Sequence, residues 1–231
     1  MSRMQDEPWY LQEQITQNYE SYYETKYKRA DALEKKLLKK LLEQLDDTQK
    51  LLEVGCGTGH FTRWMETLGL ESYGLDLSHL MLREARKLWP NGPLLQGDSE
   101  YLPFKSESFD VVVFIACLEY MPNIAKVFAE AARVARKGIV IGLMNKWSPP
   151  TIRRMIQVKM GKNPYYKNAR FYSISDIKRI LQEAFGDKHA IVYWTTTVFA
   201  KIFGDKESAL FPFGAFLGIA TKLGDGRERI V

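Results

Sequence analysis

The chain has 231 residues, a net charge of +5 and 45% apolar residues. This length suits one well-cored domain with modest additions and excludes two full domains. The longest uninterrupted apolar runs, such as residues 111–118, are far below the ~18 residues of a membrane span. No positively charged leader precedes an apolar stretch at the N-terminus, so we expect a cytoplasmic protein without a transmembrane segment. Two cysteines and three histidines lack metal-ligand spacing, and no metal site is expected.

The first 46 residues are expected to form an N-terminal helical cap. The sequence predicts helix from Trp9 to about Leu45, because leucines recur at helical spacing in its second half, where they are Leu33, Leu37, Leu38, Leu41, Leu42 and Leu45. That apolar face should pack on a sheet. Before it lies an aromatic cluster of Tyr10, Tyr19, Tyr22, Tyr23 and Tyr27.

A short apolar strand, residues 51–54, runs into a turn with glycines at 55, 57 and 59. Because glycine has no Cβ, a ligand can lie against bare backbone there before a helix begins. The second predicted strand ends at Asp76, 21 positions after Gly55. A parallel βαβ unit places at that point a carboxylate that accepts hydrogen bonds from ribose hydroxyls. The pattern indicates a purine nucleoside ligand.

The residues after the turn separate the nucleoside cofactors. A dinucleotide-binding turn needs a third glycine at the sixth position, and counting from Gly55 that position holds His60. A P-loop needs lysine followed by serine or threonine, whereas Gly59 is followed by histidine and phenylalanine. The turn therefore fits neither NAD nor ATP well.

The remaining elements alternate between strand and helix. Ser78 should cap a helix that ends near Leu88, and residues 94–96 and 109–114 read as strands. A helix over 123–135 and a strand over 138–144 follow. A capping box, Ser173 to Asp176, precedes another helix, and residues 190–198 and 213–222 are β-rich.

The turn Glu53-Val54-Gly55-Cys56-Gly57-Thr58-Gly59, with Asp76, Asp98 and the strand from Phe109, resembles the class I S-adenosylmethionine-dependent methyltransferases over about residues 45–145. The similarity is strongest to the methyltransferase type 11 and quinone-biosynthesis enzymes. It implies a Rossmann-like α/β fold whose seven-stranded, mostly parallel sheet carries helices on both faces and has an antiparallel last strand. It also implies a methyltransferase domain over residues 47–231, with S-adenosylmethionine as cofactor and S-adenosylhomocysteine as product.

The resemblance assigns residues to the methionine and ribose parts of the cofactor. Glu53 should reach toward the methionyl amino group, and Gly55 and Gly57 should line the methionine and ribose. Asp76 should bind the ribose hydroxyls. The backbone at Ala116 should lie near the methionyl end.

Other positions correspond to the adenine side. Leu77 should pack on the ring, Asp98 should accept a hydrogen bond from the adenine amino group, and the Ser99 backbone should contact the ring. In the family, N-terminal helices fold over the cofactor, so Tyr19 and Tyr27 are candidates for touching it.

The candidate catalytic residues are Glu119 and Tyr120, which follow the fourth strand. A sulfonium methyl group is already activated, so in-line displacement mainly needs a nucleophile held about 3 Å away. If the acceptor is a hydroxyl, Glu119 is the best placed general base. Many relatives carry histidine at one or both positions, and this chain departs from that pattern. Alternatively, Glu119 only caps the next turn or meets a cation.

Residues 145–172 form an expected insertion on the substrate side of the domain. They lie in a stretch, residues 131–175, with ten basic residues and no acid. A basic amphipathic helix is predicted over 151–160, with Ile152, Met155, Ile156 and Met160 on one stripe. The helix either closes over an acidic substrate, makes peripheral contact with an anionic membrane, or covers the sheet edge.

Three functions remain open from the sequence. The first is methyl transfer to a small, anionic or lipid-like metabolite. The second is methylation of tRNA or rRNA, which the basic stretch with its interleaved aromatic residues would support. The third is a protein that binds S-adenosylmethionine without transferring its methyl group.

Overall fold

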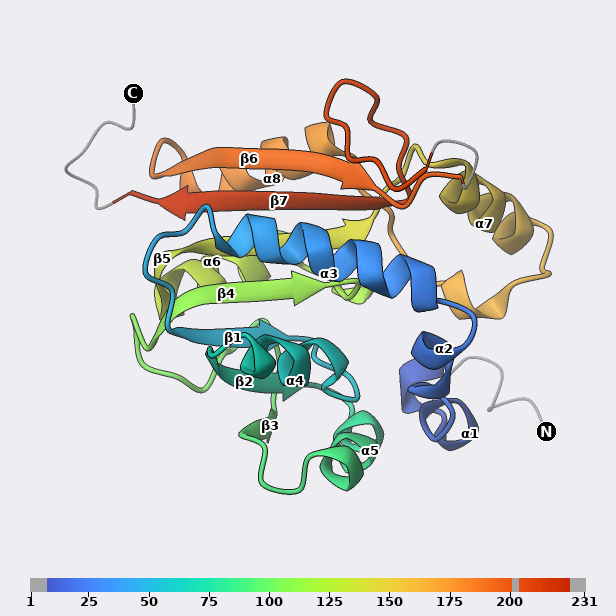
Figure 1. Ribbon diagram of the computed structural model, residues 1–231, viewed down its shortest axis with the longest axis horizontal. Coiled ribbons are helices and arrows are strands. Elements are labelled where there is room, and N and C mark those ends of the chain that lie inside the picture. Colours follow the sequence, from blue (N-terminus) through green and yellow to red (C-terminus); the bar gives the residue numbers. More distant parts are fainter. Residues whose placement is uncertain (1–7, 201–203, 225–231) are drawn as a thin grey trace.

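Seven strands form one sheet in the order β3-β2-β1-β4-β5-β7-β6 (Figure 1). The structure is a computed structural model that describes residues 8–200 and 204–224. The strands are β1 (Lys50–Val54), β2 (Glu71–Asp76), β3 (Leu94–Gln96), β4 (Phe109–Ile115), β5 (Ala135–Met144), β6 (His189–Thr197) and β7 (Phe216–Leu223). β7 runs antiparallel to both its neighbours, and the other pairings are parallel. The predicted sheet is confirmed.

Helices cover both faces of the sheet, as predicted (Figure 1). The longer ones are α3 (Lys28–Leu42), α4 (His60–Thr67), α5 (His79–Leu88), α6 (Ile124–Val134), α7 (Pro149–Lys159) and α8 (Ile174–Phe185). Short ones are η2 (Trp9–Leu11), α1 (Glu13–Thr16), α2 (Ser21–Glu24), η3 (Leu118–Tyr120) and η4 (Pro164–Tyr166). None of the described helices is long and apolar enough to cross a membrane.

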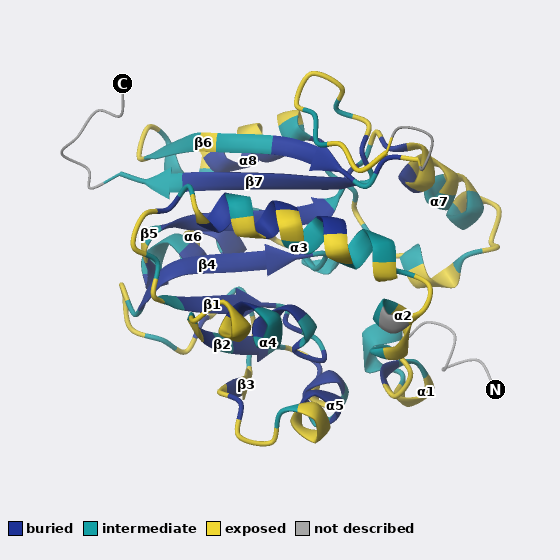
Figure 2. Ribbon diagram, viewed as in Figure 1, coloured by how far each residue is buried: buried dark blue, intermediate teal, exposed yellow. Residues whose placement is uncertain are grey.

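Strand β4 lies at the centre of the core and is buried along its whole length (Figure 2). Successive side chains of a strand point to opposite faces. Val111 and Val113 accordingly pack in the apolar cluster under α3 and α4, whereas Val112 and Phe114 pack in the cluster under α6 and α8. The near-continuous apolar run that marked this strand in the sequence reflects burial on both faces.

The order of the strands places a crevice at the carboxyl ends of β1 and β4. From β1 the chain proceeds outward through β2 and β3, and then returns to pair β4 with the other side of β1. Connections that leave two adjacent parallel strands in opposite directions leave open the space above the strand ends. The glycine turn after β1 and the segment after β4 both face this space.

The N-terminal segment is not one helix, which corrects the prediction for residues 9–45. Its first part breaks into η2, α1 and α2, and only α3 is long. The hydroxyls of Thr16, Ser21 and Thr25 each donate to a backbone carbonyl three or four residues earlier. Such bonds compete with helix propagation. The leucines of α3 are buried against the sheet, as expected.

Helix α7 does not cover the sheet edge with its apolar stripe, so that alternative is wrong. Ile152, Ile156 and Met160 are 38%, 53% and 57% exposed. The face that the helix turns inward carries Thr151, which is buried. Periodicity identified the stripe, but three of its four side chains face outward and only Met155 is half-buried.

Replacing Leu41 by alanine should lower the free energy of unfolding by about 2–5 kcal/mol, because its fully buried side chain joins α3 to the sheet. Urea unfolding followed by circular dichroism measures the loss. The matched control is Leu88→Ala at the exposed end of α5, which should change stability by less than about 0.5 kcal/mol. Equal losses in the two variants would contradict the packing described for α3.

Candidate functional site

A cavity of about 450 Å³ opens at the carboxyl ends of β1, β2 and β4. Four separate stretches at the edge of the sheet contribute to it: the glycine turn, the end of β2, the loop after β3 and the end of β4. Nine of the ten residues expected to bind the cofactor line this cavity: Tyr19, Glu53, Gly55, Gly57, Asp76, Leu77, Asp98, Ser99 and Ala116. The sequence motifs therefore converge on one space.

Two glycines of the turn leave the backbone accessible. Gly55 has a φ of 77°, and a Cβ there would lie 2.6 Å from the Cβ of Cys117. Gly57 has a φ of 55°, and a Cβ there would meet no atom within 4 Å. Close packing against Cys117 thus leaves no room for a side chain at position 55, whereas Gly57 presents bare backbone to open space in the cavity.

The Asp76 carboxylate joins the turn to the start of α5. Its Oδ2 accepts a hydrogen bond of 2.7 Å from the Gly57 N–H, and its Oδ1 accepts one of 2.8 Å from the Ser78 N–H. Burial raises the pKa of Asp76, although both backbone bonds act against that rise. Each carboxylate oxygen can accept a further hydrogen bond, so Asp76 keeps acceptor capacity for a ligand in the cavity.

Glu53 is a buried acid in the cavity wall. Its side chain is 1% exposed, and the Thr62 hydroxyl of α4 donates to Oε2. Burial raises the pKa of this carboxyl to about 8, so it holds a proton at neutral pH. A cationic group placed beside it would favour the ionised form. The site is therefore suited to an ammonium ligand.

The rim beyond Asp76 combines an apolar and a polar residue. Leu77 is 55% exposed and offers an apolar surface to the cavity. Asp98 is exposed, and its Oδ1 accepts a hydrogen bond of 2.8 Å from the Glu100 N–H. Together with Ser99, they offer a flat heterocycle both an apolar surface and hydrogen-bonding groups.

Ala116 sits where β4 ends, in a left-handed backbone conformation with a φ of 50°. Its N–H donates to the carbonyl of Gly142 at 2.8 Å, which anchors the turn to β5. Alanine pays a conformational cost there that glycine would avoid. Unusual backbone conformations of this kind cluster at functional sites.

Aromatic side chains of the N-terminal segment form one wall of the cavity. Trp9 stacks on Tyr19 with ring centroids 5.3 Å apart and meets Tyr120 edge-on at 5.6 Å. The sequence analysis passed over Trp9 as a site residue, although it is an aromatic residue close to the tyrosine cluster. Tyr27 is not among the described residues that line this cavity. It precedes α3, and its ring lies against Tyr22 instead.

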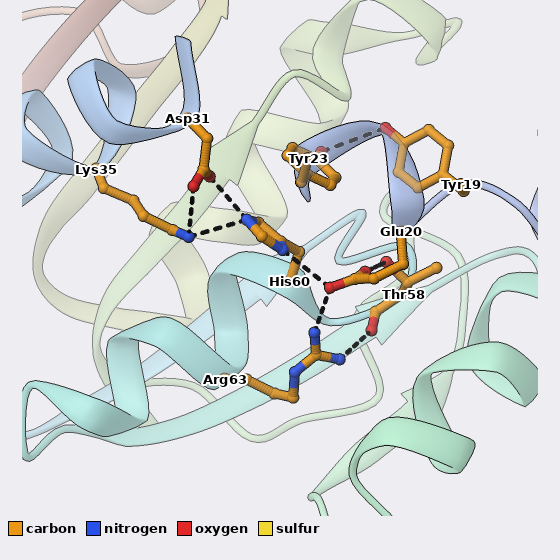
Figure 3. Close-up of polar contacts among 8 residues, drawn as sticks. All are labelled: Tyr19, Glu20, Tyr23, Asp31, Lys35, Thr58, His60 and Arg63. Atoms are coloured by element: carbon orange, nitrogen blue, oxygen red, sulfur yellow. Dashed lines mark hydrogen bonds and ion pairs between the residues drawn. The ribbon is translucent and has the colours of Figure 1, made fainter. Parts of the chain in front are cut away.

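A charged network, here called the latch, holds this N-terminal segment to the glycine turn (Figure 3). Glu20 accepts hydrogen bonds from the hydroxyl of Thr58 at 2.6 Å and from Arg63 at 2.5 Å. His60 lies between two carboxylates, with Nδ1 3.0 Å from Glu20 and Nε2 2.7 Å from Asp31. Only an imidazolium can donate to both, so the geometry favours protonated His60.

The latch shifts the pKa values of Glu20, Asp31 and His60 in the direction that keeps these three groups charged. Burial lowers the pKa of His60, but the hydrogen bonds to Asp31 and Glu20 outweigh it and raise the pKa above 6.5. The ammonium of Lys35 lies 2.9 Å from Nε2 and opposes this rise. Burial raises the pKa values of Glu20 and Asp31, but hydrogen bonds led by those with His60 leave both lowered.

Glu119 is a second buried acid of the cavity, at 1% exposure. Its Oε1 accepts a hydrogen bond of 2.6 Å from the Met144 N–H, whereas Oε2 is buried and has no hydrogen-bond partner within the described structure. Burial raises the pKa of Glu119 to about 7. Tyr120, the other candidate catalytic residue, also lines the cavity, and burial raises the pKa of its hydroxyl.

Asn168 and Arg170 complete the cavity near Glu119, and sequence analysis did not single them out as site residues. The N–H of Arg170 donates to the Glu119 carbonyl at 2.7 Å, which joins the segment after η4 to η3. The guanidinium of Arg170 donates to the Pro122 carbonyl at 3.4 Å. This part of the cavity therefore joins the Arg170 backbone to Glu119, whose carboxyl has its pKa raised to about 7.

Replacing His60 by glutamine should lower the unfolding free energy by about 1–3 kcal/mol near pH 6. Because folding raises the His60 pKa, this stabilisation is fully present below about pH 6.5 and is lost as the pH rises through the folded-state value. Chemical unfolding of both proteins from pH 5 to 9 measures the difference. His79→Gln, at an exposed position, is the control. A difference that does not shrink at alkaline pH would contradict a charged latch.

Comparisons with known proteins agree with this geometry. A family model described as a methyltransferase domain matches residues 52–141. The malonyl-[acyl-carrier protein] O-methyltransferase of Hamiltonella defensa is 30% identical over 158 residues, which are 67% of this chain and 60% of that protein. An uncharacterised protein of Methanocaldococcus jannaschii is 33% identical over 153 residues, which are 65% of this chain and 69% of that protein. The chain thus spans 60% of the length of the first relative.

A solved structure shares the fold across nearly the whole chain. It is a SAM-dependent methyltransferase of Thermotoga maritima, described as a possible histamine N-methyltransferase. The two align with a TM-score of 0.73 and 23% identity, over 93% of this chain and 98% of the other. Together with the matched methyltransferase domain and the relatives, the sheet order and the glycine turn lead to one conclusion. The chain belongs to the class I S-adenosylmethionine-dependent methyltransferases.

Proposed function

We propose that this chain transfers a methyl group from S-adenosylmethionine to a small, anionic or lipid-like metabolite by in-line displacement. The observation that carries the proposal is a single cavity that contains both the cofactor residues and a separate polar group, Glu119 with Arg170. A cofactor and an acceptor can therefore meet in one enclosed space. The H. defensa relative is named for methylating a malonyl group, which bears a carboxylate.

The residues present fit S-adenosylmethionine. Buried Glu53 suits its methionyl ammonium, and the exposed backbone at Gly57 suits the methionine and ribose. Asp76 would accept from the ribose hydroxyls. Leu77 and Asp98 would hold the adenine by packing and hydrogen bonding. When bound, the cofactor supplies a methyl group already activated by its sulfonium centre.

The acceptor end of the cavity favours an anion. Arg170 belongs to the cavity wall and carries a positive charge, and Glu119 loses its negative charge progressively as the pH falls below about 7. The protonated carboxyl accepts at Oε1 from Met144 and can donate from Oε2, the atom with no partner in the described structure. A carboxylate acceptor is itself a nucleophile, so no general base is required. In this scheme Glu119 orients the acceptor rather than deprotonating it.

Replacing Glu53 by glutamine should weaken S-adenosylmethionine binding about tenfold, a loss of about 1.4 kcal/mol, because the ammonium loses its carboxylate. The same change should stabilise the unliganded protein, because folding raises the Glu53 pKa from 4.5 to about 8. That stability difference should be near zero below about pH 4.5, grow between about pH 4.5 and 8, and level off at higher pH. Calorimetric titration and chemical unfolding measure the two effects.

Glu66→Gln, at an exposed position of α4, serves as the control for Glu53 and should change neither quantity. The opposite signs of the two effects exclude partial unfolding as the cause of weaker binding. Unchanged affinity in Glu53→Gln, or no binding of S-adenosylmethionine to the unmodified protein, would overturn the proposed cofactor site.

Replacing Glu119 by glutamine should abolish a pH dependence of methyl transfer. With a carboxylic acid acceptor, the rate of S-adenosylhomocysteine release should fall as the pH rises through about 7, because Oε2 loses its proton. The glutamine variant should remain active within about tenfold and show no such fall. Rates measured from pH 5.5 to 9 against a panel of carboxylic acids and malonyl thioesters test this.

The control for Glu119 is Glu183→Gln on the surface of α8, which should keep the normal pH profile. A rate that instead rises above pH 7 and is lost in Glu119→Gln would identify Glu119 as a general base for a hydroxyl acceptor. That result would contradict the anionic acceptor.

A further inference from the structure

The outward stripe of α7 is an exposed apolar surface bordered by positive charge. Ile152, Ile156 and Met160 follow each other at intervals of four residues, so they lie along one side of the helix. Each is more than one-third exposed. Arg153 and Lys159, both exposed, lie next to the stripe on its two sides at 100° per residue. No acidic residue occurs in α7.

The opposite side of the helix faces the protein. Arg154 lies there, with its guanidinium carbon 5.2 Å from the centroid of the Tyr166 ring in η4. Thr151 on the same side is buried and accepts a hydrogen bond from the Ser148 hydroxyl at 2.9 Å. The helix is therefore anchored by its inner side, and the outward direction of the stripe follows from that anchoring.

A neighbouring loop carries further exposed apolar side chains. Trp147, just before α7, and Leu210 and Phe211, between β6 and β7, are exposed, Leu210 to 98%. Buried Asn145 connects the two segments: its Nδ2 donates to the Pro212 carbonyl at 2.8 Å, and its Oδ1 accepts from the Trp147 N–H at 3.3 Å. One asparagine thus fixes the start of α7 beside the end of this loop.

We propose that the α7 stripe and this loop dock the protein on an anionic lipid bilayer. The apolar side chains project from a helix and a loop, and a bilayer accepts projecting side chains among its acyl chains. Arg153 and Lys159 would lie at the level of the headgroups, where each cation near an anionic surface adds attraction. RNA fits less well, because phosphates would pair with the cations but leave Ile152, Ile156 and Met160 without apolar partners.

The docking surface adjoins the acceptor side of the cavity. α7 packs on η4, and the segment directly after η4 supplies Asn168 and Arg170 to the cavity wall. A protein docked through α7 would hold this wall close to the lipid surface. The docking proposal does not require the proposed reaction, and its test uses neither cofactor nor acceptor.

Vesicle flotation tests the proposal with the full chain. Vesicles of phosphatidylcholine alone are compared with vesicles that contain about 30% phosphatidylglycerol. The protein should float with the anionic vesicles, in a salt-sensitive manner, and not with the neutral ones. The double variants Ile156→Ser/Met160→Ser and Arg153→Glu/Lys159→Glu should each bind about tenfold more weakly or worse.

Matched controls change the same chemistry elsewhere. Leu88→Ser removes an exposed apolar side chain from α5, and Lys36→Glu/Lys105→Glu reverses two exposed charges. Both should float like the unmodified protein, and all variants should show the same unfolding midpoint because every changed residue is exposed.

Three results would overturn the proposal. One is that the unmodified protein does not float with anionic vesicles. A second is that both α7 variants float normally. The third is that loss of binding follows only charge and is reproduced with single-stranded RNA in place of vesicles, which would make this face an RNA-binding surface. Failure of cofactor binding in the calorimetric experiment would leave the docking result standing, so the two proposals fail separately.

Discussion

The parallel pairing of β1 with β4 is the constraint on which the site depends. It brings two strands that are distant in sequence into register, Leu51 opposite Val111 and Glu53 opposite Val113, while the chain leaves them in opposite directions. The turn after β1 and the turn after β4 then share one edge of the sheet. Gly55 packs on Cys117 so closely that only glycine fits. The floor of the cavity is thus formed where the Gly55 backbone packs on the Cys117 side chain.

The cavity gathers acids whose burial is unfavourable without a ligand. Glu53 and Glu119 lie in its wall at 1% exposure, and both have raised pKa values. Buried carboxyl groups of this kind reduce stability at alkaline pH, and binding sites commonly carry such a cost. The charged groups that are well paired lie instead in the latch, where Glu20 and Asp31 flank His60. The paired charges of the latch therefore stabilise the fold, whereas the buried carboxyls of Glu53 and Glu119 are available to a ligand.

Local sequence signals placed most strands and helices and identified the glycine turn and Asp76, whereas the arrangement of the sheet and the other residues expected near the turn came from the resemblance to the class I methyltransferases. They placed Glu119, Tyr120 and an insertion over residues 145–172 on the substrate side of the cavity, but they did not single out Arg170 within that insertion. A hydrogen bond between the backbone groups of Arg170 and Glu119, which are far apart in the chain, brings Arg170 to the cavity. No spacing of residues in the sequence predicts such a contact. Periodicity likewise found the stripe of α7 but not its direction, which depends on what Arg154 and Thr151 contact. The sequence indicated Tyr27 as a cavity residue and passed over Trp9, whereas Trp9 lines the cavity and Tyr27 is not among its described lining residues. The reason is the same, because aromatic composition identifies a cluster but not which rings point into the cavity.

The N-terminal segment is fastened to the same turn that forms the cavity floor. Glu20 binds Thr58 within the turn, and the Ser78 hydroxyl donates to the Tyr10 carbonyl at 2.5 Å just beyond Asp76. These contacts hold Trp9 and Tyr19 at the cavity wall. Any ligand beneath these rings would stay longer while the segment remains fastened. Because charged contacts are screened by salt, exchange at this site should quicken with ionic strength.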